Sequence, residues 1–170
     1  SGYGLIRHVL IRTSLHFNEV MVVIVTTKEE FPSRNNFVKA LVNKFNYITT
    51  VVQNINSRDT NVILGEKERI IYGKGYIQDS ILGINFFISS KSFFQVNPYQ
   101  VEKLYTKAFE FASLNKNDVL LDAYSEIGTI GLIASKYVKQ VVQVEKEPSA
   151  VKNALESIKR NNINNVKVIN

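Results

Sequence analysis

The chain has 170 residues, no cysteine, a formal net charge of +6 and a pI of about 9.4. The lack of cysteine excludes disulfides, thiolate metal sites and a cysteine nucleophile supplied by these residues. The basic charge fits a polyanionic partner such as RNA, although a composition biased toward Lys and Asn explains it equally well. No apolar run reaches the roughly 20 residues of a membrane span, and no signal-peptide pattern opens the sequence. We therefore expect a cytoplasmic protein without membrane contact.

The first 90 residues predict strands arranged around one helix. Apolar strands are expected at Leu5–Thr13 and Val20–Thr27, with a hairpin turn at Asn18-Glu19 between them. A helix is expected to begin at Pro32-Ser33, and Tyr47–Ile55 returns to strand. Glycines then separate four short strand candidates: Asn61–Leu64, Arg69–Tyr72, Gly75–Gln78 and Ile84–Ser89. This pattern indicates an α+β platform over residues 1–90 that ends in a meander.

The remaining residues, 91–170, predict a hinge followed by alternating helices and strands. Lys91–Pro98 breaks the strand pattern, and Pro98 opens a helix. A βαβαβ run follows, whose expected elements are a strand at Val119–Ala123, a helix to about Tyr137, a strand at Gln140–Val144, a helix from Pro148 and a strand at Val166–Ile169. This order indicates an α/β fold with the first half of a Rossmann-like parallel sheet. Because three parallel strands leave an edge uncovered, we expect the chain to be a truncated part of a longer protein.

A glycine-bearing turn follows the first strand of this run. A dinucleotide-binding turn would read G-x-G-x-x-G, but here Glu126 precedes Gly128 and Gly131. A carboxylate at that position opposes a pyrophosphate, which argues against NAD and FAD. S-adenosylmethionine carries no phosphate and is positively charged, and Asp122 at the strand end suits that charge. The alternative is a packing turn without a ligand.

Glu145 ends the second strand of the run, at the sheet edge where ligands of open α/β folds bind. A carboxylate there can accept hydrogen bonds from both ribose hydroxyls. The alternative is a surface glutamate that caps a strand.

Two adjacent aromatic residues, Phe93 and Phe94, stand in the hinge. One ring could pack inward while the other stacks on an exposed base. The pattern alone favours packing of both rings in a core. Gln95 beside them offers amide donors and an acceptor.

Basic residues stand in the first strand of the platform. Strand alternation places Arg7 on the face opposite His8 and Arg12. These side chains could contact phosphates, although solvated basic residues on a sheet face are commoner. His8 could equally be a core histidine.

Four segments together resemble the RNA (uracil-5-)-methyltransferase family, which makes 5-methyluridine in ribosomal or transfer RNA with S-adenosylmethionine. They are Gly4–Arg12, Gln53–Asn56, Ser92–Asn97 and Leu120–Ser135. The likeness extends over essentially the whole chain. The hinge segment discriminates best, because many unrelated methyltransferases share a glycine turn followed by an acid.

The resemblance implies two sets of site residues. The residues expected to hold S-adenosylmethionine are Gln95, Tyr124, Gly128, Thr129 and Glu145. The residues expected to contact the substrate are Phe93, Arg7 and His8. Gln95 would contact the methionine portion and Glu145 the ribose, while Phe93 would lie beside the target uracil. Arg7 and His8 would face RNA.

The chain departs from the family pattern at the turn and in its lack of cysteine. Family members usually have Cys-Gly where this chain has Ser125-Glu126. Glu126 adds bulk and charge, which would weaken cofactor binding or reposition the cofactor's amino group. In the family, a cysteine thiolate attacks C6 of uracil so that C5 becomes nucleophilic. We expect no catalytic residue and no metal site in this chain, the nucleophilic cysteine downstream, and no activity from this part alone.

The expected function is therefore that of one part of an S-adenosylmethionine-dependent RNA methyltransferase that modifies C5 of uridine. Among the possible RNA partners, 23S ribosomal RNA is favoured over transfer RNA. Two alternatives remain open. One is a non-catalytic, methyltransferase-like RNA-binding protein, and the other is a methyltransferase that acts on another RNA or protein atom.

Overall fold

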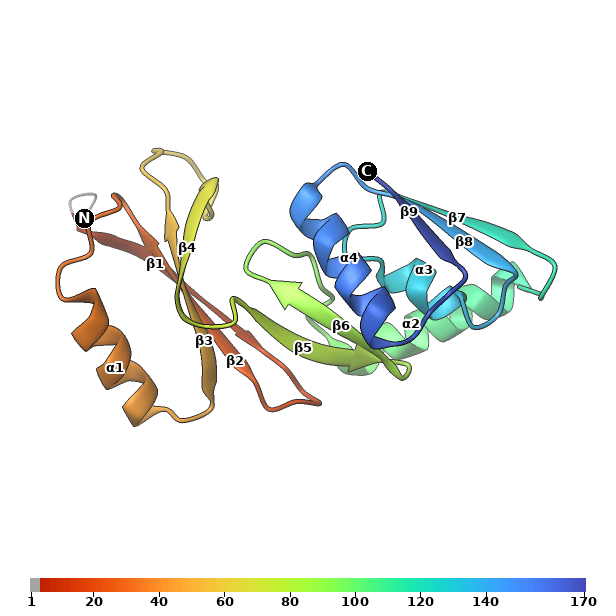
Figure 1. Ribbon diagram of the computed structural model, residues 1–170, viewed down its shortest axis with the longest axis horizontal. Helices are drawn as coiled ribbons and strands as arrows, with labels where there is room; N and C mark the ends of the chain where they lie inside the picture. Colours follow the sequence, from red (N-terminus) through yellow and green to blue (C-terminus); the bar gives the residue numbers. More distant parts are fainter. Residues whose placement is uncertain (1–3) are drawn as a thin grey trace. The chain divides into compact units, whose positions relative to one another are not determined.

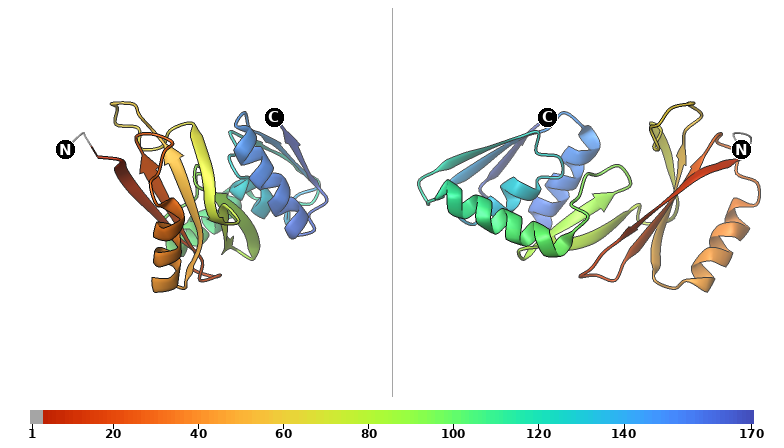
Figure 2. Two further views of the ribbon diagram at one scale, coloured as in Figure 1. Left: turned by 60° about the vertical axis from the view of Figure 1, so that its left-hand side comes forward. Right: turned by 180° about the vertical axis from the view of Figure 1, so that it is seen from behind.

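The computed structural model describes residues 4–170, which form two compact units (Figures 1 and 2). Unit 1 holds the residues up to Ile77 together with Ser89–Lys91, and unit 2 holds Gln78–Ile88 and Ser92–Asn170. The α/β fold class expected from the sequence is confirmed. The division into domains at residues 1–90 and 91–170 stays a prediction.

Unit 1 is built on a four-stranded sheet with the order β1-β2-β3-β4 (Figure 1). Strands β1 (Ile6–Thr13) and β2 (Val20–Thr26) pair antiparallel. Strand β3 (Ile48–Ile55) runs parallel to β2, so the intervening helix α1 (Arg34–Lys44) is a crossover connection. Strand β4 (Lys67–Gly73) closes the sheet antiparallel to β3.

The core of unit 1 lies between α1 and the two central strands. Strand β2 is β-branched and apolar along almost its whole length, as a strand with a neighbour on each side requires. Its inward residues and those of β3 pack against partly buried side chains from α1 and its flanks and from the strands β2 and β4. The buried members are Val22, Ile24, Ile48 and Val51, and the flanking ones are Val20, Phe31, Leu41, Val42, Phe45 and Ile71.

The strand expected at Asn61–Leu64 is wrong, because side chains of β3 and of the residue after it bind the backbone that a strand would need. The Asn56 amide donates to the carbonyls of Val62 and Ile63 at 2.7 and 3.1 Å. The Asn54 side chain accepts from the Gly65 N–H at 2.6 Å and donates to its carbonyl at 3.1 Å. The segment is thereby held as an irregular loop.

The expected meander does not form, because β4 stays in the four-stranded sheet. Strands β5 (Tyr76–Ile81) and β6 (Ile84–Ser89) make a separate two-stranded sheet. Leu82 and Gly83 connect them, with φ of 48° and 74°. Positive φ at both central residues is the geometry of a tight hairpin turn.

Unit 2 contains a three-stranded parallel sheet with the order β7-β8-β9, as the sequence predicts. Its strands are β7 (Val119–Ala123), β8 (Gln140–Val144) and β9 (Val166–Ile169), and helices α3 (Thr129–Ala134) and α4 (Pro148–Arg160) connect them. Helix α3 ends before the expected Tyr137. Lys136 and Tyr137 instead donate to the carbonyls three residues back, which tightens the last turn.

Helix α2 (Pro98–Ala112) begins where the sequence predicts. The side chain of Asn97 accepts a hydrogen bond from the Gln100 N–H at 3.1 Å, and Pro98 occupies the first helical position. No helix in the described part of the chain is long and apolar enough to cross a membrane.

Side chains of α4 and of the residue after it bind the backbone of β6 within unit 2. Ser157 Oγ accepts from the Phe87 N–H at 3.1 Å. The Asn161 side chain accepts from the Asn85 N–H at 2.9 Å and donates to its carbonyl at 2.7 Å. These bonds satisfy main-chain groups of β6 that have no strand partner on that side.

Candidate cofactor site

The connection between β7 and α3 is a tight turn in an unusual backbone conformation. Tyr124, Glu126 and Gly128 have φ of 58°, 52° and 84°. The Gly128 N–H donates to the Ser125 carbonyl at 2.7 Å, and the Ser125 N–H donates to the Val144 carbonyl at 3.1 Å. The second bond ties the turn to the end of β8, so the turn and the residue after β8 lie together.

Glu145 is that residue, and its carboxylate is held by two backbone N–H groups. Oε2 accepts from Glu126 at 2.9 Å, and Oε1 accepts from Glu147 at 2.8 Å. Its side chain is buried, with 6% of the residue exposed. A carboxylate oxygen has two lone-pair directions, so each oxygen can still accept one bond from a ligand hydroxyl. The acid is thus oriented by the fold before any ligand binds.

The turn carries negative charge. Partial burial raises the pKa of the Glu126 carboxyl, and repulsion from Glu145 and Glu147 raises it further. The negative charges that raise the pKa of Glu126 also disfavour a further anion at the same place. The arrangement therefore disfavours a pyrophosphate and suits a cationic or neutral nucleoside.

Asp122 lies beneath the turn and not, as the sequence suggests, toward the cofactor's charge. Its Oδ2 accepts from the Gly131 N–H at 2.9 Å and from the Gln143 amide at 3.3 Å. Asp122 and Gln143 are buried. Both hydrogen bonds to Asp122 Oδ2 thus come from groups of the protein itself.

Four of the five expected cofactor residues lie on or beside this turn. Tyr124 is 88% exposed, which leaves its ring free to cover a ligand. Thr129 Oγ1 lies 3.4 Å from the Tyr105 hydroxyl of α2. With Gly128 and Glu145 they form one constellation at the carboxyl ends of β7 and β8. Their roles toward a cofactor stay predictions.

Tyr105 and Gln143 belong to this neighbourhood without being predicted from the sequence. Tyr105 has only the helical spacing of a core residue. Gln143 gave a signal that could have been used, because it is a polar residue flanked by valines in a strand that parallel neighbours bury.

The hinge separates the two aromatic rings that the sequence pattern placed together in a core. Phe94 packs against Phe86 with ring centroids 5.9 Å apart, whereas Phe93 is 59% exposed. Ser92 is buried and accepts from the Asn153 amide at 2.8 Å. The preference for both rings in a core is therefore wrong, and Phe93 is available for a partner.

Gln95, the fifth expected cofactor residue, lines a hollow of about 440 Å³ along the start of α2. The other residues of this hollow are Asn97, Gln100, Val101, Lys103, Leu104 and Lys107. Contact between Gln95 and a methionine moiety stays a prediction.

The two expected RNA-contacting residues of β1 lie in unit 1 and differ in surroundings. Arg7 is half-buried, and its Nη1 donates to the carbonyl of Asn56 at 2.9 Å and to that of Arg58. His8 is exposed. Arg7 thus fixes the loop after β3, whatever its role toward RNA.

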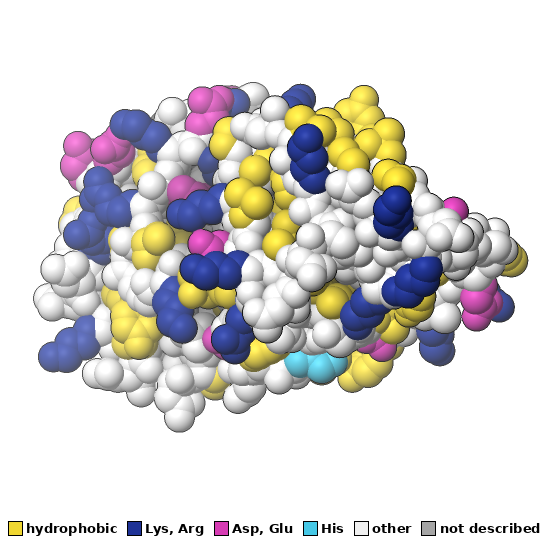
Figure 3. Space-filling view, turned by 45° about the vertical axis from the view of Figure 1, so that its right-hand side comes forward, with side chains coloured by type: hydrophobic (Ala, Val, Ile, Leu, Met, Phe, Trp, Pro, Cys, Tyr) yellow, Lys and Arg dark blue, Asp and Glu magenta, His cyan; other side chains and the backbone are white. Residues whose placement is uncertain are grey.

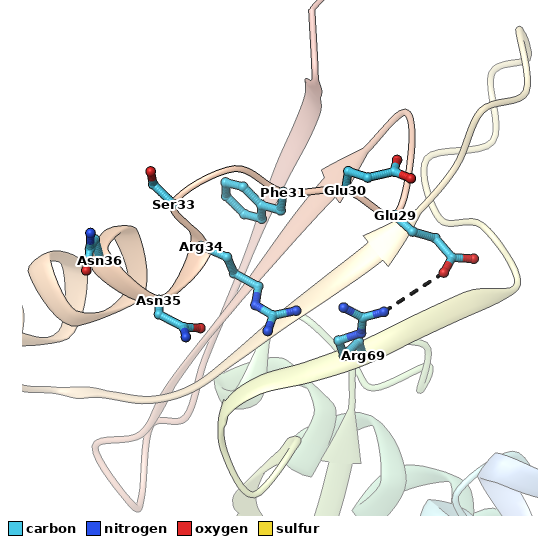
Figure 4. Close-up of a pocket in the computed structure, with 8 residues that line it drawn as sticks. All are labelled: Glu29, Glu30, Phe31, Ser33, Arg34, Asn35, Asn36 and Arg69. Atoms are coloured by element: carbon cyan, nitrogen blue, oxygen red, sulfur yellow. Dashed lines mark ion pairs between the residues drawn. The ribbon is translucent and has the colours of Figure 1, made fainter.

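Unit 1 also carries an open polar hollow of about 500 Å³ between the start of α1 and β4 (Figure 4). Figure 4 shows the guanidinium groups of Arg34 and Arg69 directed into the same space. Arg69 makes an ion pair with Glu29 at 3.9 Å. The remaining lining residues are Glu30, Phe31, Ser33, Asn35 and Asn36.

Comparison with known proteins places these features in a family. Residues 14–170 match the family model described as tRNA (Uracil-5-)-methyltransferase. An uncharacterized RNA methyltransferase of Oceanobacillus iheyensis is 40% identical over 166 residues, and one of Clostridium acetobutylicum is 42% identical over 169. The matches cover 98% and 99% of this chain but only 36% and 37% of those proteins.

A solved structure gives the same assignment. The tRNA (uracil-54, C5)-methyltransferase of Pyrococcus abyssi, determined in complex with S-adenosyl-L-homocysteine, matches with a TM-score of 0.74 and 26% identity. The match covers 98% of this chain and 40% of that one. Together with a family match over nearly the whole sequence, this means that the chain belongs to the tRNA (uracil-5-)-methyltransferase family.

Proposed function

We propose that the protein carrying this chain is an S-adenosylmethionine-dependent methyltransferase that modifies C5 of uridine in structured RNA. The observation that carries the proposal is the Glu145 carboxylate, which the N–H groups of Glu126 and Glu147 hold at the end of β8. The first RNA to test is 23S ribosomal RNA, and transfer RNA is the second.

The residues of the turn fit S-adenosylmethionine better than a dinucleotide. Glu126, Glu145 and Glu147 raise the local negative charge, which a sulfonium and an ammonium group would offset. The Pyrococcus abyssi relative has S-adenosyl-L-homocysteine bound. When present, the cofactor would supply an electrophilic methyl group.

The chain's own residues would bind and orient the two reactants. Glu145 would accept hydrogen bonds from the ribose hydroxyls through the lone pairs that its backbone partners leave open. Tyr124 would cover the nucleoside, with the Gly128-Thr129 backbone against it. Gln95 would contact the methionine portion. The exposed ring of Phe93 would lie beside a uracil turned out of its stack.

Basic side chains of the surface support RNA as the partner. The net charge is +6, and Figure 3 shows Lys and Arg side chains spread over the face drawn there, more widely than acidic ones. The hollow of unit 1 adds the guanidinium groups of Arg34 and Arg69, which suit phosphate, beside the carboxylates of Glu29 and Glu30 that line the same hollow and oppose it. We propose these two arginines, and also Arg7 and His8, as contacts to the RNA substrate.

The chain does not supply the nucleophile that uracil methylation at C5 requires. It contains no cysteine, and uracil C5 gains enough nucleophilicity only when a thiolate adds to C6. We propose that a cysteine elsewhere in the whole protein performs this step. The 170-residue chain alone should then transfer no methyl group.

The test uses the whole protein that carries this chain. Incubation with labelled S-adenosylmethionine and transcripts of 23S ribosomal RNA or transfer RNA should yield 5-methyluridine on digestion and mass spectrometry. RNA containing 5-fluorouridine should trap the protein as a covalent adduct, because the fluorine cannot leave C5. Cofactor binding and methyl transfer without an adduct would reassign the reaction to another atom. Absence of cofactor binding at millimolar concentration would favour a non-catalytic RNA-binding protein.

A further inference from the structure

Gln143 is a fully buried polar side chain in the middle strand of the unit 2 sheet. It stands in β8 between Val142 and Val144, where a strand flanked on both sides by parallel neighbours is normally apolar. A buried amide is costly unless it is hydrogen-bonded. Its position therefore needs a reason beyond filling the core.

The amide of Gln143 donates two hydrogen bonds beneath the turn that connects β7 with α3. Nε2 donates to the Gly128 carbonyl at 3.1 Å and to Asp122 Oδ2 at 3.3 Å. The same oxygen of Asp122 accepts from the Gly131 N–H at 2.9 Å. A continuous set of bonds thus runs from Gly128 through Gln143 and Asp122 to Gly131. It clamps the first turn of α3 at both ends.

The two glycines and Gln143 also fit together sterically. A Cβ added at Gly128 would lie 2.6 Å from Gln143 Nε2, and one added at Gly131 would lie 2.5 Å from the same atom. The side chain therefore fills the space that the absence of two Cβ atoms opens. The backbone of the turn rests directly on the amide.

We propose that Gln143, together with Asp122, is a positioning residue for cofactor binding. The hydrogen bonds of this pair fix the position and orientation of the Gly128–Gly131 backbone, against which the cofactor is proposed to lie. Neither side chain touches the cofactor in this scheme. The inference rests on the proposed function and adds the buried support that the turn needs.

The competing explanation is that Gln143 only fills volume. The two explanations differ for Gln143→Met, which keeps the size and flexibility of the side chain but removes the donor. If Gln143 positions the turn, the variant should fold but bind S-adenosylmethionine at least about tenfold more weakly, because it loses both hydrogen bonds that Gln143 donates. If it only fills volume, cofactor affinity should stay at the wild-type value.

The experiment is calorimetric titration of the whole protein with S-adenosylmethionine for wild type, Gln143→Met and Gln140→Met. Gln140 lies in the same strand with an exposed side chain and provides the matched control. In methylation assays, Gln143→Met should raise KM for the cofactor and leave KM for RNA unchanged, whereas Gln140→Met should change neither. Wild-type affinity in Gln143→Met would overturn the inference.

A second pair of variants decides the matter if Gln143→Met folds poorly. Gln143→Glu places a carboxylate against Asp122 and should bind cofactor more weakly than any other variant. Asp122→Asn keeps an oxygen at the place of Oδ2, which can still accept from Gly131 and from Gln143, so this variant should bind cofactor nearly as well as wild type. A folded Gln143→Glu protein that binds cofactor as tightly as Asp122→Asn would contradict the positioning role.

The proposed function and this inference fail in different ways. Wild-type protein that does not bind S-adenosylmethionine overturns both. Wild-type protein that binds it, combined with unchanged affinity in the Gln143 variants, overturns only the positioning role.

Discussion

The backbone N–H of Glu126 donates to Oε2 of Glu145 at 2.9 Å, which links the conformation of the turn to the orientation of the acid after β8. Glu126 has a φ of 52°. The residue that distinguishes this turn from a glycine-rich one therefore orients the proposed ribose ligand through its backbone. Its side chain adds charge at the same place.

Replacement of Glu145 by Gln should weaken S-adenosylmethionine binding by about 10- to 100-fold. The amide can accept from only one of the two N–H groups that hold the carboxylate, and it loses charge-assisted bonds worth about 1.5–3 kcal/mol. Calorimetric titration of the whole protein measures the change. Glu147→Gln is the control for charge, since it removes one nearby negative charge and keeps the N–H that donates to Glu145. Equal effects of the two variants would argue against a ribose contact by Glu145.

Replacement of Glu126 by Gly should raise the free energy of unfolding by about 1 kcal/mol. A side chain at a φ of 52° meets its own backbone, and glycine does not. Urea denaturation measures the difference. Glu126→Ala separates strain from charge, because it keeps Cβ and removes the carboxylate. If Ala stabilises as much as Gly, the gain comes from relieved repulsion with Glu145 and Glu147 rather than from the backbone.

Asp122 should give the stability of the protein a defined pH dependence. Burial raises the pKa of its carboxyl above the ordinary value of 3.8, although bonds from Gly131 and Gln143 oppose the shift. The folded state then binds the proton more tightly than the unfolded state. This stabilising contribution is fully present below pH 3.8 and is lost as the pH rises through the raised pKa.

Denaturation of wild type and Asp122→Asn between pH 3 and pH 7 checks this sign. The stability of wild type relative to the variant should fall with rising pH and then level off. A relative stability that rises over the same range would mean that the two hydrogen bonds outweigh burial and lower the pKa.

Replacement of Gly131 by Ala should destabilise the protein by about 1–3 kcal/mol, the usual cost of an overpacked core. The new Cβ would lie 2.5 Å from Gln143 Nε2 and 2.8 Å from Asp122 Oδ2. The same change in a Gln143→Ala background should cost clearly less, because the shorter side chain removes the first clash. Thermal melting of wild type, the two single variants and the double variant measures the coupling energy between positions 131 and 143. Strictly additive effects would show that the glycine and the glutamine do not constrain each other.

Arg7→Ala should destabilise unit 1 by about 1–3 kcal/mol, since two backbone carbonyls, those of Asn56 and Arg58, lose their donor. The loop after β3 should then be cut faster by proteases. His8→Ala, at the exposed neighbouring position, should change stability by less than about 0.5 kcal/mol. RNA affinity measured for both variants tests the proposed substrate contacts. A loss in His8→Ala without a change in stability would support a direct contact.

The sequence by itself determined the order of the elements in unit 2 and the position of its turn. Period-two and helical apolar patterns, Pro98 and Pro148 at helix starts, and Gly128 after an apolar strand are local signals, and each predicted its element. The strand at Asn61–Leu64 failed because the side chains of Asn54 and Asn56, six to 11 residues earlier, bind the backbone of residues 62–65. The meander failed because the pairing of β5 depends on tertiary contacts and not on its own residues.

Only the tertiary structure decided how the candidate site is supported. Strand alternation does not say which of Phe93 and Phe94 turns inward, because both fit a core until Phe86 is placed beside one of them. Asp122 stands at a strand end where the sequence directs it toward a ligand, yet the fold brings Gly131 and Gln143 to it first. Residues 122, 131 and 143 belong to three different elements, so parallel pairing of β7 with β8 is the physical cause that joins them.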